Sequence, residues 1–280
     1  MATGTIPNVT TIAGVDPSGG AGVLADVKAI SANGAYACGV IAALTAQNTQ
    51  GVTGIQPVPP EFVRLQIDTL FSDVAIAAVK IGMLGQRPVT LVVAERLAHW
   101  KPATCVLDPV MIAKSGDALL ERDAIGALRE ALLPVATMIT PNLPEAGVLL
   151  EQRAPETLSE MRRAAERLRD TMAHEGERWV YLKGGHLPGG DAIDLLHDGD
   201  RMIELTVARI DTKNTHGTGC TLSSALAALI PQSPDVPTAA RRAKDYLTRA
   251  IQASGELGVG KGHGPVHHFW RLRSEAPVAR

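Results

Sequence analysis

The chain contains few aromatic residues and few cysteines. Phe, Trp and Tyr make up 3% of its 280 residues, so Ala, Val, Leu and Ile must build the core. The three cysteines, Cys38, Cys105 and Cys220, lie far apart, and no Cys-x-x-Cys pair or Cys/His cluster indicates a zinc site or a disulfide framework. We therefore expect a reducing environment such as the cytoplasm.

Long hydrophobic runs and an excess of positive charge are absent as well. No apolar run approaches the roughly 20 residues of a membrane span, and residues 1–10 lack the pattern of a signal peptide. With 27 basic and 29 acidic side chains the net charge is −2, and Lys and Arg form no long run. We expect neither a membrane nor a nucleic acid as the main partner.

Short apolar runs alternate with amphipathic stretches, which is typical of a mostly parallel sheet covered by helices on both faces. We predict an α/β fold with an N-terminal extension at 1–8, one domain at 9–273 and a tail at 274–280. The expected strands are 9–13, 36–44, 75–81, 104–107, 137–139, 179–182, 192–197 and 202–207. The expected helices are 22–33, 60–71, 87–99, 117–132, 143–150, 159–174, 219–230 and 238–256. Because Asp198-Gly199-Asp200 favours a tight turn, the last two strands should form a hairpin at the sheet edge.

Polar or glycine-rich segments follow five of these strands. The segments are 14–20, 82–84, 108–111, 140–145 and 183–186. The carboxyl ends of parallel strands meet at one edge of a sheet, and ligands of open α/β folds bind there. Stability alone does not explain five such segments, so the sequence predicts a ligand site at this edge.

The stretch Asn-Thr-His-Gly-Thr-Gly-Cys at 214–220 opens directly into an apolar run that predicts a helix. Unpaired N–H groups at a helix start attract anions such as phosphate, and Gly217 and Gly219 let a ligand approach the backbone. Cys220 stands at this start, where we expect the pKa of its thiol to fall toward neutrality. It would then accept the proton of an alcohol that attacks a phosphate. The alternative is a glycine turn before a core helix with a small buried cysteine.

Two interpretations are open for the turn that contains Asn142 and Glu145. Magnesium bound with nucleotide phosphates needs few protein ligands, so this pair would suffice. Alternatively, Asn142 caps the following helix and Glu145 closes a capping box. Asp108 is a further acidic candidate. Lys183 ends a buried strand, where a lone cation is costly, and a phosphate would be a fitting partner.

Four other polar residues are further candidates, and three of them have a structural alternative. Lys213 and His216 precede the glycine turn and would serve a loop over the substrate, although a loop His is as often structural. Asp26, one turn into the first predicted helix, would either face the substrate or complement the helix dipole. Gln47 offers a donor and an acceptor to a heterocycle, or it is simply solvated.

Taken together and in this order, the motifs resemble the hydroxymethylpyrimidine/phosphomethylpyrimidine kinases of thiamine biosynthesis, which belong to the ribokinase-like superfamily. The resemblance extends from about Thr10 to Trp270. The segments that carry it are TIAGVDPSGGAG (11–22), KIGML (80–84), LDPVM (107–111), AKSG (113–116), TPNLPEA (140–146), LKGGH (182–186), TKNTHGTGCTLSSALAA (212–228) and GKGHGPVHHF (260–269).

The resemblance implies two successive phosphorylations by ATP, with Mg²⁺, in a homodimer. The hydroxymethyl group of 4-amino-5-hydroxymethyl-2-methylpyrimidine reacts first, and the monophosphate then becomes the diphosphate. The pyrimidine would lie near Gly14, Asp26, Gln47, Met83 and Val110. Gly217, Thr218 and Gly219 would form the anion hole, with Lys183 near the phosphates and Cys220 as the base where many relatives carry Asp. ATP and its phosphates would lie near Asp108, Asn142, Lys183, Lys213 and His216, and the metal near Glu145 and Asn142. The alternatives are a pyridoxal/pyridoxine kinase, a dual-specificity enzyme and a non-catalytic pyrimidine sensor.

Overall fold

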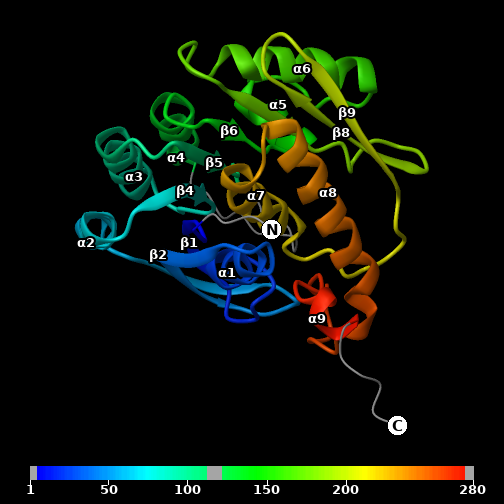
Figure 1. Cartoon of the computed structure of the whole chain (residues 1–280), viewed down its shortest axis with the longest axis horizontal. Coiled ribbons are helices and arrows are strands. Elements are labelled where there is room, and N and C mark those ends of the chain that lie inside the picture. The colour runs from blue at the N-terminus through cyan, green and yellow to red at the C-terminus, as the bar shows by residue number, and fades with distance from the viewer. Residues whose placement is uncertain (1–4, 112–121, 275–280) are drawn as a thin grey trace.

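A single sheet organises the computed structural model, which describes residues 5–111 and 122–274 (Figure 1). Its nine strands lie in the order β3-β2-β1-β4-β5-β6-β7-β8-β9. Their bounds are β1 Asn8–Val15, β2 Tyr36–Gln47, β3 Val52–Pro57, β4 Ile76–Ile81, β5 Thr104–Leu107, β6 Met138–Ile139, β7 Trp179–Leu182, β8 Asp191–His197 and β9 Met202–Ala208. The strands from β2 to β7 pair in parallel, whereas β3, β8 and β9 pair antiparallel. The mostly parallel sheet and the β8–β9 edge hairpin are therefore confirmed.

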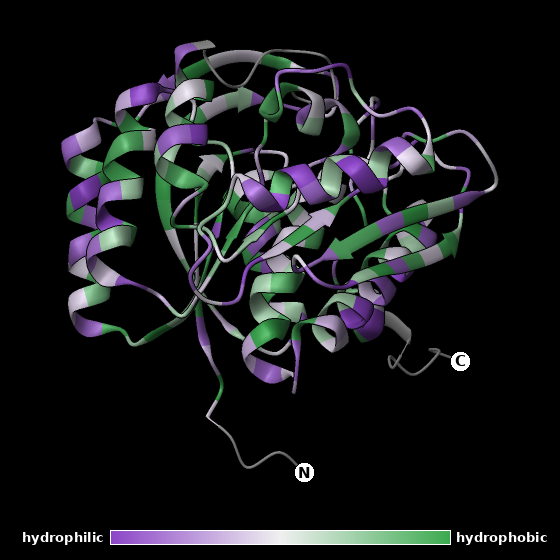
Figure 2. Ribbon diagram, turned by 90° about the horizontal axis from the view of Figure 1, so that it is seen from above, coloured by the Kyte–Doolittle hydropathy of each residue, from purple (hydrophilic) through white to green (hydrophobic). Residues whose placement is uncertain are grey.

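Helices cover both faces of this sheet. Their bounds are α1 Gly22–Ala32, α2 Pro60–Asp73, α3 Arg87–Trp100, α4 Arg122–Ala127, α5 Leu143–Leu149, α6 Leu158–Asp170, α7 Thr218–Leu229, α8 Val236–Gln252 and α9 Trp270–Ser274. A π-helix, Leu128–Leu132, continues α4, and two 3₁₀ turns, Ile230–Gln232 and Ala253–Glu256, follow α7 and α8. One apolar cluster joins α2, α3, α5 and α6 to the sheet, and a second joins α1, α7 and α8 to its other face. Figure 2 shows the resulting pattern, with hydrophobic strands inside and helices of mixed hydropathy around them.

The sequence prediction missed β3 and misplaced several helix ends. β3 lies at the edge of the sheet and is largely exposed, so it lacks the apolar alternation that marks a strand. The last long helix begins at Val236, because Asp235 accepts a hydrogen bond from the backbone N–H of Thr238 and caps it. The expected helix start at Asp117 and the AKSG motif lie outside the described residues.

Small residues let α7 pack deep in the molecule. Every residue from Thr221 to Leu229 is buried, and four of the twelve residues of the helix are Gly or Ala. The helix packs against α1 and α8 and against the sheet. Its first residues are thereby held at the carboxyl ends of the parallel strands. No helix in the described residues has the length and hydropathy to span a membrane.

The segment after α8 returns to the start of α7. The N–H of His263 donates to the Thr49 carbonyl (2.9 Å), and the N–H of His216 donates to the Gly264 carbonyl (3.1 Å). Further along, His268 Nε2 lies 3.0 Å from Thr221 Oγ1. The segment 263–268 thus contacts both the residue before the glycine turn and the first turn of α7.

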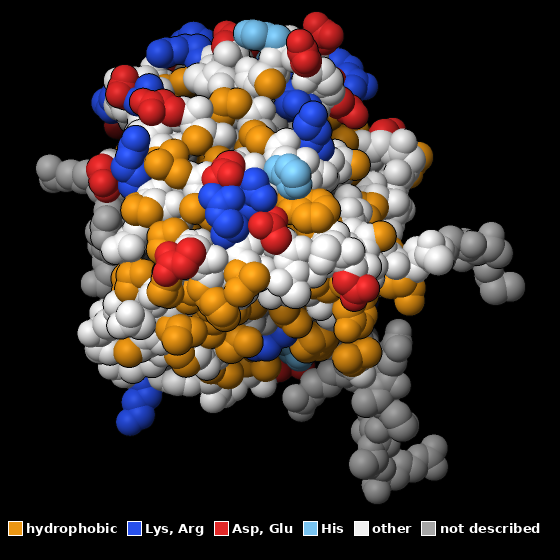
Figure 3. Space-filling view, turned by 90° about the vertical axis from the view of Figure 1, so that its left-hand side faces the viewer, with side chains coloured by type: hydrophobic (Ala, Val, Ile, Leu, Met, Phe, Trp, Pro, Cys, Tyr) orange, Lys and Arg blue, Asp and Glu red, His pale blue; other side chains and the backbone are white. Residues whose placement is uncertain are grey.

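Exposed apolar side chains gather on β2, β3 and α2. Leu44, Ile55, Phe62 and Leu65 are each between 41% and 56% exposed. Figure 3 views the side of the molecule on which α2 lies, and hydrophobic side chains crowd the lower half of that face. Contiguous apolar surface of this kind marks interaction sites in many proteins.

Candidate active site

The start of α7 is the centre of the site. Gly217 is the N-cap residue and has a φ of 75°, in the left-handed region that glycine tolerates best. A Cβ at Gly217 would lie 1.7 Å from the Gly20 carbonyl oxygen. The loop after β1 and the start of α7 therefore touch at backbone distance, which only glycine permits here.

The side chain of His216 also connects the residues before α7 to the loop after β1. Its Nε2 lies 2.7 Å from Asp16 Oδ2, and Asp16 also accepts hydrogen bonds from the side chain of Ser18 and the N–H of Ala21. Burial raises the pKa of Asp16, but the bonds from His216 and Ser18 outweigh it and leave that pKa below its usual value. The structural alternative for His216 is favoured, because its side chain is 9% exposed and contacts Asp16, and its place near the phosphates stays a prediction.

Lys183 lies against the first turn of α7. Its Nζ is 3.0 Å from Asp108 Oδ1 and 3.9 Å from Glu145 Oε2. A Cβ at Gly219 would lie 3.2 Å from that Nζ and 3.3 Å from Asp108 Oδ2. Burial lowers the pKa of Lys183, yet the two carboxylates outweigh burial and raise it, so the amine is a cation. The sequence predicted the cation and its need for a partner but not that Asp108 supplies it.

Asp108 is itself fully engaged. Its Oδ1 accepts from Thr140 Oγ1 (3.1 Å) as well as from Lys183, and its Oδ2 accepts from Ser223 Oγ (3.3 Å). The carboxylate is 1% exposed. Asp108 thus joins the ends of β5 and β6 to α7 and fixes the position of Lys183.

Asn142 and Glu145 form the capping box at the start of α5. Asn142 Oδ1 accepts from the N–H of Glu145 (2.9 Å), and Glu145 Oε2 accepts from the N–H of Asn142 (2.8 Å). Burial and the nearby Asp108 raise the pKa of Glu145 to about 7, against the lowering effect of Lys183. The structural interpretation of Asn142 is therefore correct, and its amide oxygen serves the cap.

A magnesium ion fits only part of the predicted ligand set. The described residues contain no group of three or more His, Cys, Asp or Glu that could hold a metal ion. Mg²⁺ bound with phosphates commonly takes one or two carboxylates and completes its shell with water and phosphate oxygens. Glu145, whose side chain is 11% exposed beside Lys183, fits that mode.

The thiol of Cys220 is not shifted toward neutrality. The residue is partly exposed, and burial raises the pKa of the thiol to about 11. Asp26 and Asp108 contribute to this rise, and Lys80 and the Gly22 amide oppose it. The prediction was wrong because it weighed the helix start and not the desolvation of the sulfur.

Asp26 does not face an open site. It is fully buried, and Lys80 Nζ donates to both of its oxygens at 2.8 and 2.9 Å. Thr11 Oγ1 and Ser224 Oγ also donate to it, at 2.6 and 2.8 Å. The expected substrate contact is therefore replaced by a buried ion pair under α7. The sequence analysis missed Lys80, and its signal was a lysine inside an otherwise apolar strand.

The remaining predicted substrate residues lie around the ends of β1, β2, β4 and β5. The Gly14 N–H donates to the Met83 carbonyl (2.9 Å), and a Cβ at Gly14 would lie 2.5 Å from Met83 Cε. The Val110 N–H donates to the Asp108 carbonyl (2.8 Å) in the turn after β5. Gln47 is partly buried at the end of β2. Lys213 is exposed on the segment that leads to His216.

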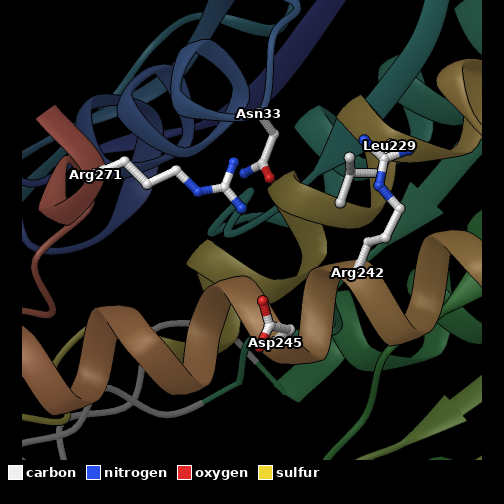
Figure 4. Close-up of a pocket in the computed structure, with 5 residues that line it drawn as sticks. All are labelled: Asn33, Leu229, Arg242, Asp245 and Arg271. Carbon is white, nitrogen blue, oxygen red and sulfur yellow. The ribbon is translucent and has the colours of Figure 1, made fainter. Parts of the chain in front are cut away.

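A separate pocket lies at the other end of α7. Figure 4 shows Asn33, Leu229, Arg242, Asp245 and Arg271 around it. Leu229 is the last residue of α7, so about 16 Å of helix separates this pocket from Thr218. The pocket is not part of the site described above.

Comparison with known proteins decides the family. The family model described as phosphomethylpyrimidine kinase matches residues 16–267. The chain belongs to the phosphomethylpyrimidine kinase family. A relative in Rhizobium meliloti (strain 1021), a hydroxymethylpyrimidine/phosphomethylpyrimidine kinase, is 48% identical over 93% of this chain and 96% of its own. The resemblance drawn from the motifs is confirmed.

Two solved structures share the fold. A phosphomethylpyrimidine kinase from Clostridium difficile is 36% identical, covers 88% of this chain and all of its own, and superposes with a TM-score of 0.77. The pyridoxal kinase of Bacillus subtilis in an ADP complex is 32% identical, with a TM-score of 0.85 over 94% of this chain and 98% of its own. The predicted ribokinase-like α/β fold is therefore confirmed.

Proposed function

We propose that this chain is an ATP-dependent kinase that phosphorylates 4-amino-5-hydroxymethyl-2-methylpyrimidine and then converts the monophosphate to the diphosphate. The observation that carries this function is the start of α7, where backbone N–H groups lie beside the Lys183 cation. Such a pairing of helix start and cation stabilises the negative charge of a phosphoryl group in transfer. The identity of almost half the residues with the relative from Rhizobium meliloti supports the pyrimidine as substrate.

The chemistry needs one bond made and one broken in each step. The hydroxymethyl oxygen attacks the γ-phosphorus, the bond to the β–γ bridging oxygen breaks, and ADP leaves. In the second step an oxygen of the bound monophosphate attacks another ATP in the same way. Gly217, Thr218 and Gly219 would hold the transferring group, and Lys183 would neutralise its charge. Mg²⁺, held through Glu145, would supply further positive charge at the ATP phosphates.

Cys220 is the proposed acceptor of the alcohol proton. Since its pKa is about 11, the thiol is protonated at neutral pH and must lose its proton before it acts. Phosphoryl transfer through a loose transition state requires little help from a base, which suits a sparsely ionised thiol. Gly14, Gln47, Met83 and Val110 would surround the pyrimidine, and Asp26 would act only by holding α7 in place.

Further parts of the proposal concern the nucleotide, the assembly and the location. Lys213 is an exposed cation on the segment entering α7 and would reach ATP phosphates. The exposed apolar face of β2, β3 and α2 supports a second copy of this chain as partner, because a homodimer would cover it. The domain bounds of 9–273 and the cytoplasmic location stay predictions.

The test is turnover by the purified 280-residue chain with ATP and Mg²⁺. ADP release would be measured with the pyrimidine alcohol, its monophosphate and pyridoxal as acceptors. We expect the two pyrimidines to react faster than pyridoxal. Faster reaction of pyridoxal would favour a pyridoxal kinase, and tight pyrimidine binding without ADP release would indicate a sensor.

A further inference from the structure

Asp194 of β8 is a buried carboxylate outside the site described above. It is 6% exposed, and its two oxygens face different parts of the fold. Oδ1 accepts from the N–H of Gly184 at 2.9 Å. Oδ2 accepts from Tyr181 Oη at 3.0 Å and from Lys244 Nζ of α8 at 2.5 Å. One oxygen thus binds the backbone of the residue after Lys183, and the other binds two side chains in the core.

The backbone around Lys183 is held from both sides. The Lys183 N–H donates to the Pro141 carbonyl (2.9 Å) on the β6 side. Gly184 packs so closely against β8 that a Cβ would lie 1.9 Å from the Ile193 carbonyl oxygen. Asp194 supplies the remaining restraint on the β8 side, because its carboxylate takes the Gly184 N–H.

A buried carboxylate would not be stable in this place without its other partners. Removing a charge from water is expensive, and the cost is offset only when hydrogen bonds and an opposite charge satisfy it. Lys244 provides the charge and also donates to the Ala192 carbonyl (3.2 Å). Tyr181 and Lys244 therefore hold Asp194 rigid, which makes it a firm support for the backbone at Gly184.

We propose that Asp194 is a positioning residue for Lys183. By fixing the Gly184 N–H it sets where the Lys183 side chain leaves the end of β7, and hence where Nζ lies between Asp108 and Gly219. The inference rests on the proposed kinase function. Its physical content is that the cation reaches the transferring phosphate only while this backbone segment stays in place.

The decisive comparison is between variants that remove different hydrogen bonds of the Asp194 carboxylate. Asp194→Ala removes the support of Gly184, whereas Tyr181→Phe removes one bond to Oδ2 and leaves the Gly184 bond intact. We expect Asp194→Ala to lower kcat by on the order of 10- to 10²-fold, with the KM for the pyrimidine unchanged. Tyr181→Phe should lower stability but keep kcat, and Asp194→Asn should recover most of kcat because its amide oxygen still accepts from Gly184.

Two further variants guard against misfolding and surface effects. If Asp194→Ala does not fold, Asp194→Leu combined with Lys244→Met replaces the ion pair by apolar side chains and still lacks the acceptor. Asp191→Asn changes an exposed aspartate at the start of the same strand and should leave kcat unaltered.

A readout independent of turnover separates this inference from the proposed function. Hydrogen exchange at the Gly184 amide should accelerate in Asp194→Ala and stay slow in Tyr181→Phe. Unchanged exchange, or equal loss of kcat in Asp194→Ala and Tyr181→Phe, would overturn the positioning role. An inactive wild-type chain whose Gly184 exchange still depends on Asp194 would contradict the kinase function and the role of Asp194 in catalysis, and leave only the backbone restraint.

Discussion

At the residue scale, the thiol of Cys220 lies where a helix start favours an anion and where burial disfavours one. Its pKa of about 11 gives a defined pH dependence. Only the thiolate accepts a proton, and its fraction rises about tenfold for each pH unit below the pKa. We expect kcat/KM for the pyrimidine alcohol to rise with pH from neutrality to about pH 10.

Substitution of Cys220 separates its role as a base from the binding of the phosphate. Cys220→Ala should retain the fold and lose on the order of 10²- to 10⁴-fold in kcat. Cys220→Asp should give a flatter profile, since a carboxylate ionises far below neutrality in its ordinary state. Steady-state kinetics across this pH range test both variants. An unchanged slope in Cys220→Asp would show that another group controls the profile.

Lys183 allows a second prediction at the same scale. Lys183→Ala removes the cation beside α7, so kcat should fall by on the order of 10²-fold while the KM for the pyrimidine changes little. The variant also leaves Asp108 buried without its cation, which lowers the free energy of unfolding. Arg153→Ala, at an exposed basic residue outside the site, is the control. A rise in the KM for the pyrimidine with normal kcat would show that Lys183 binds the substrate and does not stabilise the transferring phosphate.

At the scale of elements, the contact between the β1–α1 loop and α7 depends on a residue without a Cβ. Gly217→Ala would place a methyl group 1.7 Å from the Gly20 oxygen at a φ of 75°. We expect a loss of at least about 1–3 kcal/mol in the free energy of unfolding and a loss of kcat, because the loop must move. Gly126→Ala is the control, since a Cβ there meets nothing within 4 Å. Chemical unfolding of both variants measures the difference.

Elements differ in how far the sequence predicts them. The parallel strands and the β8–β9 hairpin follow from apolar runs and from Asp-Gly, which are local signals. The exposed edge strand β3 has no such pattern. Most candidate site residues were proposed because they follow strand ends, but their pairing was not predicted. The Lys80–Asp26 and Asp108–Lys183 contacts join residues 54 and 75 positions apart. Only the packed sheet brings such partners together.

At the scale of the whole molecule, the buried His268 makes stability depend on pH. Burial, together with the charges of Lys28 and His267, lowers its pKa to about 3. The unfolded chain binds a proton near pH 6.5, so stability is complete above that pH and is lost as the pH falls toward 3. The slope approaches about 1.4 kcal/mol per pH unit. His268→Gln should reduce this slope of the free energy of unfolding against pH. His174→Gln, at an exposed histidine, should leave the slope unchanged.

The apolar face of β2, β3 and α2 gives a prediction about assembly. Leu65→Glu places a charge among exposed apolar side chains and should convert the proposed homodimer to a monomer without unfolding it. Light scattering after gel filtration measures the mass. Leu272→Glu, at an exposed leucine of α9, should leave the mass unchanged. A wild-type chain that is already monomeric would contradict the dimer.

Because residues 260–268 return to the start of α7, the contacts around this helix start form late in translation. Thr49, His216 and Thr221 leave the ribosome before the residues that they contact. Their partners are His263, Gly264 and His268, in that order. A nascent chain can build most of the sheet while these partners are still in the exit tunnel. The glycine turn at 217–219 is therefore left uncovered during translation and is covered only after residue 268 emerges.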